Sequence, residues 1–124
     1  MKKVIATKSA PAAVGPYSQA MKFGGFVFCS GQIGLSIDGN LAESFEKQTH
    51  QIFENLKNVL AAADSDFSKV LKVSVFLTEI ERFAEFNEIY AANFSGENLP
   101  AREVVAVKSL PKNAAVEVSL IAAA

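Results

Sequence analysis

The sequence predicts an α+β fold in a single domain spanning residues 1–124, with two helices covering one face of a β-sheet. Three observations support this prediction. The length of 124 residues is close to the usual size of one domain, and half of the residues are hydrophobic. Apolar residues alternate along several short segments, as in strands, and follow a helical period along two longer ones. No internal repeat or linker composition divides the chain.

The predicted strands begin with a hairpin. Residues 20–23 and 26–30 flank the glycine pair 24–25, which suits the positive φ angles of a tight turn. An apolar stretch around Ile33 follows, and the Asp-Gly pair at 38–39 marks a second turn. These segments precede the first helix.

A long helix is predicted from about Glu43, where the hydrophobic period changes from two to about 3.6. Its stripe of inward-facing residues is about 120° wide, so one face is buried and the other is solvated. The stripe consists of Phe45, Thr49, Ile52, Phe53, Leu56, Val59, Leu60 and Ala63. After a loop at 64–68, residues 70–78 are rich in β-branched and large apolar residues, which predicts a central strand.

The second half of the chain adds one helix and two strands. A helix is predicted over 81–94, with one face formed by Phe83, Phe86, Tyr90 and Phe94. Strands over 101–107 and 116–121 follow, joined through residues 110–113. The predicted order of elements is therefore β-β-β-α-β-α-β-β.

Two helices can cover only one face of a sheet of five or six strands. The strands at 70–78 and 116–121 nevertheless carry apolar residues on both faces, including Phe76 and Ile121. We therefore expect a homo-oligomer of closed cyclic symmetry in which the uncovered faces pack together, with pockets between subunits. These observations do not specify the number of subunits.

Composition excludes several classes of protein. The formal net charge is -1 and the chain has only two arginines, so there is no basic stripe for nucleic acid. No apolar run reaches the length of a signal-peptide core or a membrane span. A single cysteine, Cys29, can form no internal disulfide, and the lone histidine, His50, excludes a structural zinc site. We expect a soluble cytoplasmic protein without a metal.

Arg102 and Glu117 are the charged residues best suited to a functional site. Arg102 opens an apolar strand, where a buried charge needs a partner, and its planar guanidinium fits a carboxylate. The alternative is a structural arginine paired with Glu117 or with water. Glu117 interrupts Val116 and Val118, so it points away from whatever these valines pack against. If that second face is buried between subunits, a purely solvated role for Glu117 is disfavoured.

The remaining polar candidates do not form a nucleophilic triad. Strand alternation places Ser30 with Phe28 and opposite Cys29, so we expect Cys29 to be a small buried hydrophobe. His50 lies on the solvated face of the first predicted helix, which excludes a Ser/His triad.

Two further polar side chains have a structural and a functional interpretation each. Asn87 lies within the apolar stripe of the second helix, so its amide must find hydrogen-bond partners, as a brace or in a site. Tyr17 follows Pro16 in a loop, where its ring either anchors the loop or forms the wall of a pocket.

Six segments spread over nearly the whole chain carry a family resemblance. They are Gly15-Pro16-Tyr17-Ser18-Gln19-Ala20, Ser30-Gly31-Gln32, Asn87, Pro100-Ala101-Arg102, Leu110-Pro111-Lys112 and Val116-Glu117-Val118. Together they resemble the Rid family, formerly called YjgF-type proteins. The combination of the Pro-Ala-Arg motif with a glutamate fifteen residues later is a specific signal, whereas any one motif alone is weak. The resemblance implies a trimeric fold of the chorismate mutase type, with active sites in the clefts between subunits.

The resemblance also implies an activity. Deaminases of this family hydrolyse imines and enamines released by pyridoxal-phosphate enzymes, here 2-iminobutanoate and 2-iminopropanoate, to 2-keto acids and ammonia. Carried over to this chain, Arg102 would hold the substrate carboxylate and Glu117 would position or activate the attacking water. The pocket would be shaped by Tyr17, Ser30 and Asn87. The resemblance implies no metal and no organic cofactor.

The chain departs from the deaminase pattern at several positions. A small residue and then a cysteine commonly follow the arginine, whereas this chain has Glu103 and Val104. Strand parity turns Glu103 away from Arg102 and leaves Val104 on the same side, where its backbone N–H could still bind the carboxylate. Ser119 stands where a second acidic residue is common. Branches without deaminase activity often lack the arginine, so Arg102 favours the active class.

Two other functions are open at this point. A non-catalytic protein could use the same cleft and arginine to bind or sense a small carboxylate such as a keto acid. A nuclease or translation inhibitor, functions attached to parts of this family, is disfavoured by the near-neutral charge and by the lack of an aromatic and basic surface.

Overall fold

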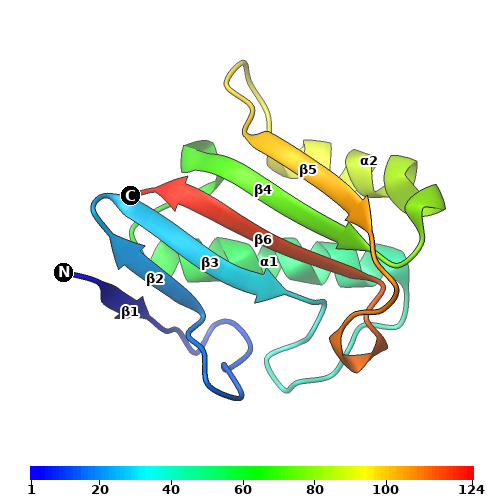
Figure 1. Ribbon diagram of the computed structural model, residues 1–124, viewed down its shortest axis with the longest axis horizontal. Coiled ribbons are helices and arrows are strands. Elements are labelled where there is room, and N and C mark those ends of the chain that lie inside the picture. The colour runs from blue at the N-terminus through cyan, green and yellow to red at the C-terminus, as the bar shows by residue number, and fades with distance from the viewer.

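A computed structural model describes residues 1–124 as a six-stranded sheet with two helices on one face (Figure 1). The strand order is β1-β2-β3-β6-β4-β5, with β4 and β5 parallel and the other neighbours antiparallel. The elements are β1 (Lys3–Ile5), β2 (Ala20–Phe23), β3 (Phe26–Gln32), α1 (Phe45–Ala62), β4 (Val70–Leu77), α2 (Phe83–Asn93), β5 (Ala101–Ala106) and β6 (Val116–Ala123). The predicted fold class, the helices on one face and the central position of β4 are confirmed.

The predicted order of elements is also confirmed, with one difference in placement. The first strand is Lys3–Ile5, which pairs with β2, and no separate strand forms around Ile33. Beyond the end of β3, the chain makes only an isolated bridge between Leu35 and Leu41. The predicted hairpin turn is present, because Gly24 and Gly25 have φ angles of 58° and 84°.

The core lies between the sheet and the two helices. The predicted apolar stripe of the first helix is buried throughout, and Phe53 at its centre contacts two aromatic rings of α2 and one at its C-terminal cap. These rings, with ring centroids 6.1 Å from that of Phe53, belong to Phe86, Tyr90 and Phe94. Aromatic pairs at such distances add about 0.5–1.5 kcal/mol beyond area burial. This packing holds α2 against α1, so both helices form one layer.

The other face of the sheet has no covering element, and Figure 1 looks onto this face with both helices behind it. Its apolar side chains include Phe28, which is 46% exposed and pairs with Ile121, and Val105, which is 42% exposed and pairs with Phe76. Exposed apolar patches of this kind are typical of interaction surfaces. The chain contains no helix whose length and hydropathy would let it span a lipid bilayer.

Candidate functional site

Glu117 lies near the start of β6 on the face that the helices do not cover. Its neighbours Val116 and Val118 are fully buried on the opposite face, as strand parity predicted. The carboxylate lies directly against Gly31, where a Cβ atom would come within 2.6 Å of Glu117 Oε2. Any side chain at position 31 would therefore displace the Glu117 carboxylate. Partial burial raises the pKa of the Glu117 carboxyl above its usual range, because the charged form loses hydration.

A break in strand pairing produces this close approach. The register between β3 and β6 shifts between Cys29 and Gln32, so the backbone of β3 departs from regular alternation at Gly31. Irregularities of this kind often re-aim a backbone or a side chain beside a functional site. In the sequence, Gly31 stands out only as part of the Ser30-Gly31-Gln32 segment, and regular alternation gives no signal of its contact with Glu117.

Three segments and Glu117 enclose a cavity of about 610 Å³. The segments lie at 11–19, 31–39 and 111–112, and Figure 1 shows the two longer loops below the sheet near the carboxyl end of β3. Tyr17 lines this cavity and is 53% exposed. Lys112, at the rim, has a φ of 57°, a left-handed conformation that is uncommon for a residue with a side chain.

Ser30 and Cys29 point to opposite faces of β3, as predicted. The Ser30 hydroxyl donates a hydrogen bond of 2.6 Å to the carbonyl oxygen of Ser18, which ties β3 to the loop that carries Tyr17. Cys29 is buried on the helix side, and burial raises the pKa of its thiol to about 12. Because the thiolate is the reactive form, Cys29 is not a nucleophile at neutral pH.

Arg102 lies at the start of β5 and is held by α2. Its Nη1 donates a hydrogen bond of 2.7 Å to Oδ1 of Asn87, and its guanidinium carbon lies 4.6 Å from the ring centroid of Tyr90 and 5.6 Å from that of Phe83. The guanidinium is thus stacked on aromatic rings and oriented while Arg102 stays exposed. The helical period predicts Phe83 and Tyr90 in the apolar stripe of the second helix. Their spacing from Asn87 indicates a shared helix face, but no sequence signal links that face to Arg102.

The structure does not bring Arg102 and Glu117 together within one chain. Arg102 pairs in register with Val73, which is buried beneath the helices, whereas Glu117 points to the uncovered face. Within one chain Arg102 therefore does not pair with Glu117, and its side-chain hydrogen-bond partner is Asn87. The candidates fall into two groups, which we call the arginine half-site (Arg102, Asn87, Tyr90, Phe83) and the glutamate half-site (Glu117, Gly31, Tyr17). Ser30 does not line the cavity and reaches this group only through its hydrogen bond to the loop that carries Tyr17.

Glu103 is turned away from Arg102, as strand parity predicted. Its carboxylate accepts a hydrogen bond from the Ser74 hydroxyl and lies 3.1 Å from Nζ of Lys72. The hydrogen bonds from Ser74 and Lys72 hold the pKa of Glu103 below its usual range. Glu103 therefore does not neutralise Arg102. Val104 is half-buried against the core on the same side of β5 as Arg102.

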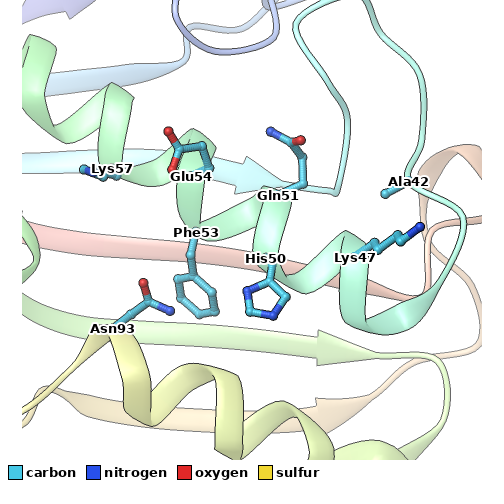
Figure 2. A pocket seen from close by; sticks show the side chains of 8 residues that line it. All are labelled: Ala42, Lys47, His50, Gln51, Phe53, Glu54, Lys57 and Asn93. Carbon is cyan, nitrogen blue, oxygen red and sulfur yellow. The ribbon is translucent and has the colours of Figure 1, made fainter.

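A second cavity, of about 630 Å³, lies on the outer side of the helices and contains none of the predicted site residues. Figure 2 shows its lining, mainly polar side chains of α1, among them Lys47, His50 and Glu54, with Asn93 of α2. His50 is exposed and its Nε2 lies 3.9 Å from Oε1 of Glu46. This is the solvated face predicted for α1, with no serine partner for His50. No group of three His, Cys, Asp or Glu side chains is placed to hold a metal.

Comparisons with known proteins match nearly the whole chain. Residues 7–124 match the family described as Endoribonuclease L-PSP. The chain is 42% identical over 123 residues to Reactive Intermediate Deaminase A of Arabidopsis thaliana, covering 98% of this chain and 65% of that protein. That relative is described as chloroplastic, so family membership does not specify the cytoplasm.

Two solved structures have the same fold. YyfA of Yersinia pestis, described as a protein of unknown function of the conserved Rid family, has a TM-score of 0.97 at 45% identity, covering 100% of both chains. TdcF of E. coli with bound serine has a TM-score of 0.91 at 34% identity, covering 98% of both chains. The match over residues 7–124, the identities and the shared fold together show that this chain belongs to the Rid family.

Proposed function

We propose that the protein is a hydrolytic deaminase that converts reactive 2-imino acids, such as 2-iminobutanoate and 2-iminopropanoate, to 2-keto acids and ammonia. The observation that carries the proposal is the Glu117 carboxylate, which is partly buried at a cavity, lies against Gly31 and forms no ion pair within the chain. A relative named Reactive Intermediate Deaminase A supports the reaction class. The serine bound to TdcF has the same carboxylate group as a 2-imino acid.

The proposed reaction needs one base and correct orientation. A water molecule attacks C2 of the protonated imine while Glu117 accepts its proton, which gives a tetrahedral carbinolamine. The proton then passes to the nitrogen, the C–N bond breaks, ammonia leaves, and the remaining hydroxyl loses its proton to form the keto group. A positioned base contributes about 10²- to 10⁴-fold. The raised pKa makes Glu117 a stronger base than an exposed carboxylate.

The arginine half-site is suited to hold the substrate carboxylate. A guanidinium has five N–H donors, and the hydrogen bond to Asn87 uses only one nitrogen, so donors remain for a carboxylate. Stacking on Tyr90 presets the plane of the group before substrate binds. In this proposal Asn87 orients Arg102, the backbone N–H of Val104 assists at the carboxylate, and Tyr17 and Ser30 shape the pocket. No metal or organic cofactor takes part.

We further propose that a complete site forms between the subunits of a homotrimer, with Arg102 from one subunit and Glu117 from the next. This arrangement accounts for the separation of the two half-sites and for the uncovered apolar face. It also places the exposed strand β5 at a subunit boundary. Light scattering at micromolar concentration should give a mass about three times the chain mass of 13.3 kDa. A monomeric mass would contradict both the trimer and the shared site.

The activity can be tested by coupling a threonine or serine dehydratase to this protein and following keto acid formation while a scavenger competes for the imine. Arg102→Lys keeps the charge but removes two-pronged hydrogen bonding, where each charge-assisted bond contributes about 1.5–3 kcal/mol. Calorimetry should therefore show much weaker binding of 2-ketobutyrate. Glu117→Gln should leave that binding largely intact and lower hydrolysis by about 10²-fold or more.

The same measurements separate the alternatives. A keto acid sensor would bind 2-ketobutyrate but give no acceleration of imine hydrolysis in the wild type. Wild-type hydrolysis that is unaffected by Glu117→Gln would contradict the role of Glu117. An RNA-cleaving activity that co-purifies with the protein over successive chromatography steps would favour the nuclease named in the family description.

A further inference from the structure

The Glu117 carboxylate is placed by the backbone around it. Burial is the only cause of its raised pKa, and it forms no ion pair within the chain, so no nearby charge or hydrogen bond orients it. Its position depends on two segments, which are the start of β6 that carries it and the end of β3, where it lies against Gly31. A group that fixes these two segments relative to each other also fixes the carboxylate.

A buried amide of α1 is bonded to the first of these segments. Gln48 is 6% exposed and lies on α1, which runs behind β3 and β6 (Figure 1). Its Oε1 accepts a hydrogen bond of 2.8 Å from the backbone N–H of Ala115, two residues before Glu117. Its Nε2 donates a hydrogen bond of 3.1 Å to the carbonyl oxygen of Ala42. Both ends of the amide are therefore hydrogen-bonded to backbone.

The hydrogen bonds continue from Ala42 to the second segment. The backbone N–H of Ala42 donates a hydrogen bond of 3.0 Å to the carbonyl oxygen of Gly34, which lies three residues after Gly31. Three consecutive hydrogen bonds thus join Ala115, Gln48, Ala42 and Gly34. Hydrogen bonds in series strengthen one another, and a network whose members are all satisfied makes the segments that it joins rigid.

The loop after β3 is also seated directly on the backbone of Gln48. At Gly34, a Cβ atom would come within 2.5 Å of the Cα of Gln48 and within 2.8 Å of its carbonyl oxygen. These atoms belong to a helix backbone, which cannot turn aside as the end of a flexible side chain can. Gln48 therefore contacts one segment through its backbone and the other through its side chain.

We propose that Gln48 is a positioning residue that holds Glu117 against Gly31 by fixing the start of β6 relative to the end of β3. The inference rests on the proposed function in one respect, which is the role of Glu117 as the base. Gln48 does not line the cavity, so it acts through the backbone and not on the substrate. Without the three hydrogen bonds, the carboxylate moves away from Gly31 and gains water.

The variant Gln48→Met tests this role without any turnover. Methionine has an unbranched side chain of similar length, but it cannot replace the two hydrogen bonds. In a carbon NMR titration of the glutamate carboxyl groups, the pKa of Glu117 should fall toward its usual range, because the displaced carboxylate is better hydrated. The other charged residues that line the cavity, Asp38 and Lys112, are unchanged in this variant, so the shift reports the position of Glu117.

The kinetics of imine hydrolysis provide a second readout. In Gln48→Met, kcat should fall by about tenfold, which is less than the loss of about 10²-fold or more expected on removal of the base. The acid limb of the kcat profile should move to lower pH together with the pKa of Glu117. KM and 2-ketobutyrate binding should be unchanged, because Arg102 is held by Asn87 in the other half-site.

Thr49→Val is the matched control. Thr49 follows Gln48 on α1 and is fully buried, but its hydroxyl donates a hydrogen bond only within the helix, to the carbonyl oxygen of Phe45 at 2.8 Å. The variant removes a buried polar group from the same part of the core. It should leave the titration of Glu117 and kcat as in the wild type.

A second variant breaks the same network without changing the buried amide. Ala115→Pro removes the N–H that Gln48 accepts, and the preceding residue, Ala114, already has the extended ψ of 149° that suits a residue before proline. It should lower the pKa of Glu117 and kcat in the same direction as Gln48→Met. The test therefore remains available if Gln48→Met does not fold.

The outcomes separate this inference from the proposed function. An unchanged pKa of Glu117 in the folded variants would overturn the positioning role, whether or not the protein is a deaminase. An equal loss of kcat in Thr49→Val would also overturn it, because the effect would then come from general destabilisation. A lowered pKa of Glu117 in Gln48→Met, together with no hydrolysis by the wild type, would support the positioning role and contradict the enzyme.

Discussion

Arg102 and Glu117 lie on opposite faces of one sheet. Arg102 is held from the helix side by Asn87 and Tyr90, and Glu117 lies against Gly31 on the uncovered face. A single small substrate cannot contact both groups within one chain. If both are required, each functional site must combine two copies of the chain.

Mixing experiments provide a direct test of this shared site. Arg102→Lys and Glu117→Gln are each expected to be nearly inactive alone. When equal amounts of the two variants are unfolded and refolded together, random assembly should leave both residues intact in about one quarter of the sites. The mixture should then have about one quarter of the wild-type activity. Each variant refolded separately is the control. No recovery in mixed oligomers, confirmed by mass spectrometry to contain both chains, would place the whole site within one subunit.

Gly31→Ala should disable the protein without unfolding it. The new Cβ would lie 2.6 Å from Oε2 of Glu117, which must move away from the cavity. Hydrolysis should fall by about 10²-fold, as on loss of the base, while circular dichroism and oligomer mass stay unchanged. The shorter side chain in the double variant Gly31→Ala/Glu117→Asp should recover part of the activity relative to Gly31→Ala. Equal activity of Gly31→Ala and wild type would show that the contact is unimportant.

Glu117→Gln should stabilise the fold at neutral pH. The folded-state pKa of this carboxyl is raised above its unfolded value by burial. The folded protein therefore binds more protons between the two pKa values, and stability falls as pH rises through this window. Calorimetry should give a higher Tm for Glu117→Gln at pH 7, with the difference shrinking near pH 4, where the carboxyl is largely protonated in both states. A lower Tm at pH 7 would indicate a partner for the carboxylate in the assembled protein.

Tyr90 is expected to act through its ring and not through its hydroxyl. The hydroxyl is buried without a hydrogen-bond partner, which costs about 1–3 kcal/mol, while the ring stacks on Arg102. Tyr90→Phe should keep keto acid binding and raise the Tm. Tyr90→Leu should weaken keto acid binding by about five- to thirtyfold through loss of the cation–π contact. Weaker keto acid binding by Tyr90→Phe would instead assign a role to the hydroxyl.

The fold was largely predictable because its signals are local. The apolar stripe of α1 and the alternation along β6 indicate which side of each element is buried, and the glycine pair indicates the hairpin turn. Strand β1 was missed because only Val4 and Ile5 supply an apolar signal there. Its pairing with β2 joins segments that a long loop separates, and no local period records such a contact.

The sequence predicted which faces the candidate side chains occupy, but not which of them lie together. Parity placed Glu117 opposite its valine neighbours and Glu103 opposite Arg102, and both placements are confirmed. Parity alone could not say which side of β5 faces the helices, because nearly every residue of this edge strand is exposed. The contact between Gly31 and Glu117 depends on a shift in strand register, and an alternating sequence pattern does not predict such a shift.

The inert thiol of Cys29 makes the chain convenient for site-specific labelling. Cys29 is the only cysteine, it is buried, and its thiol has a pKa of about 12, so maleimide reagents should leave the folded protein unmodified at pH 7. A cysteine introduced at an exposed position would then be the single reactive group. A fluorophore attached through Val14→Cys, at the rim of the cavity, would report keto acid binding in real time without any background from the native thiol.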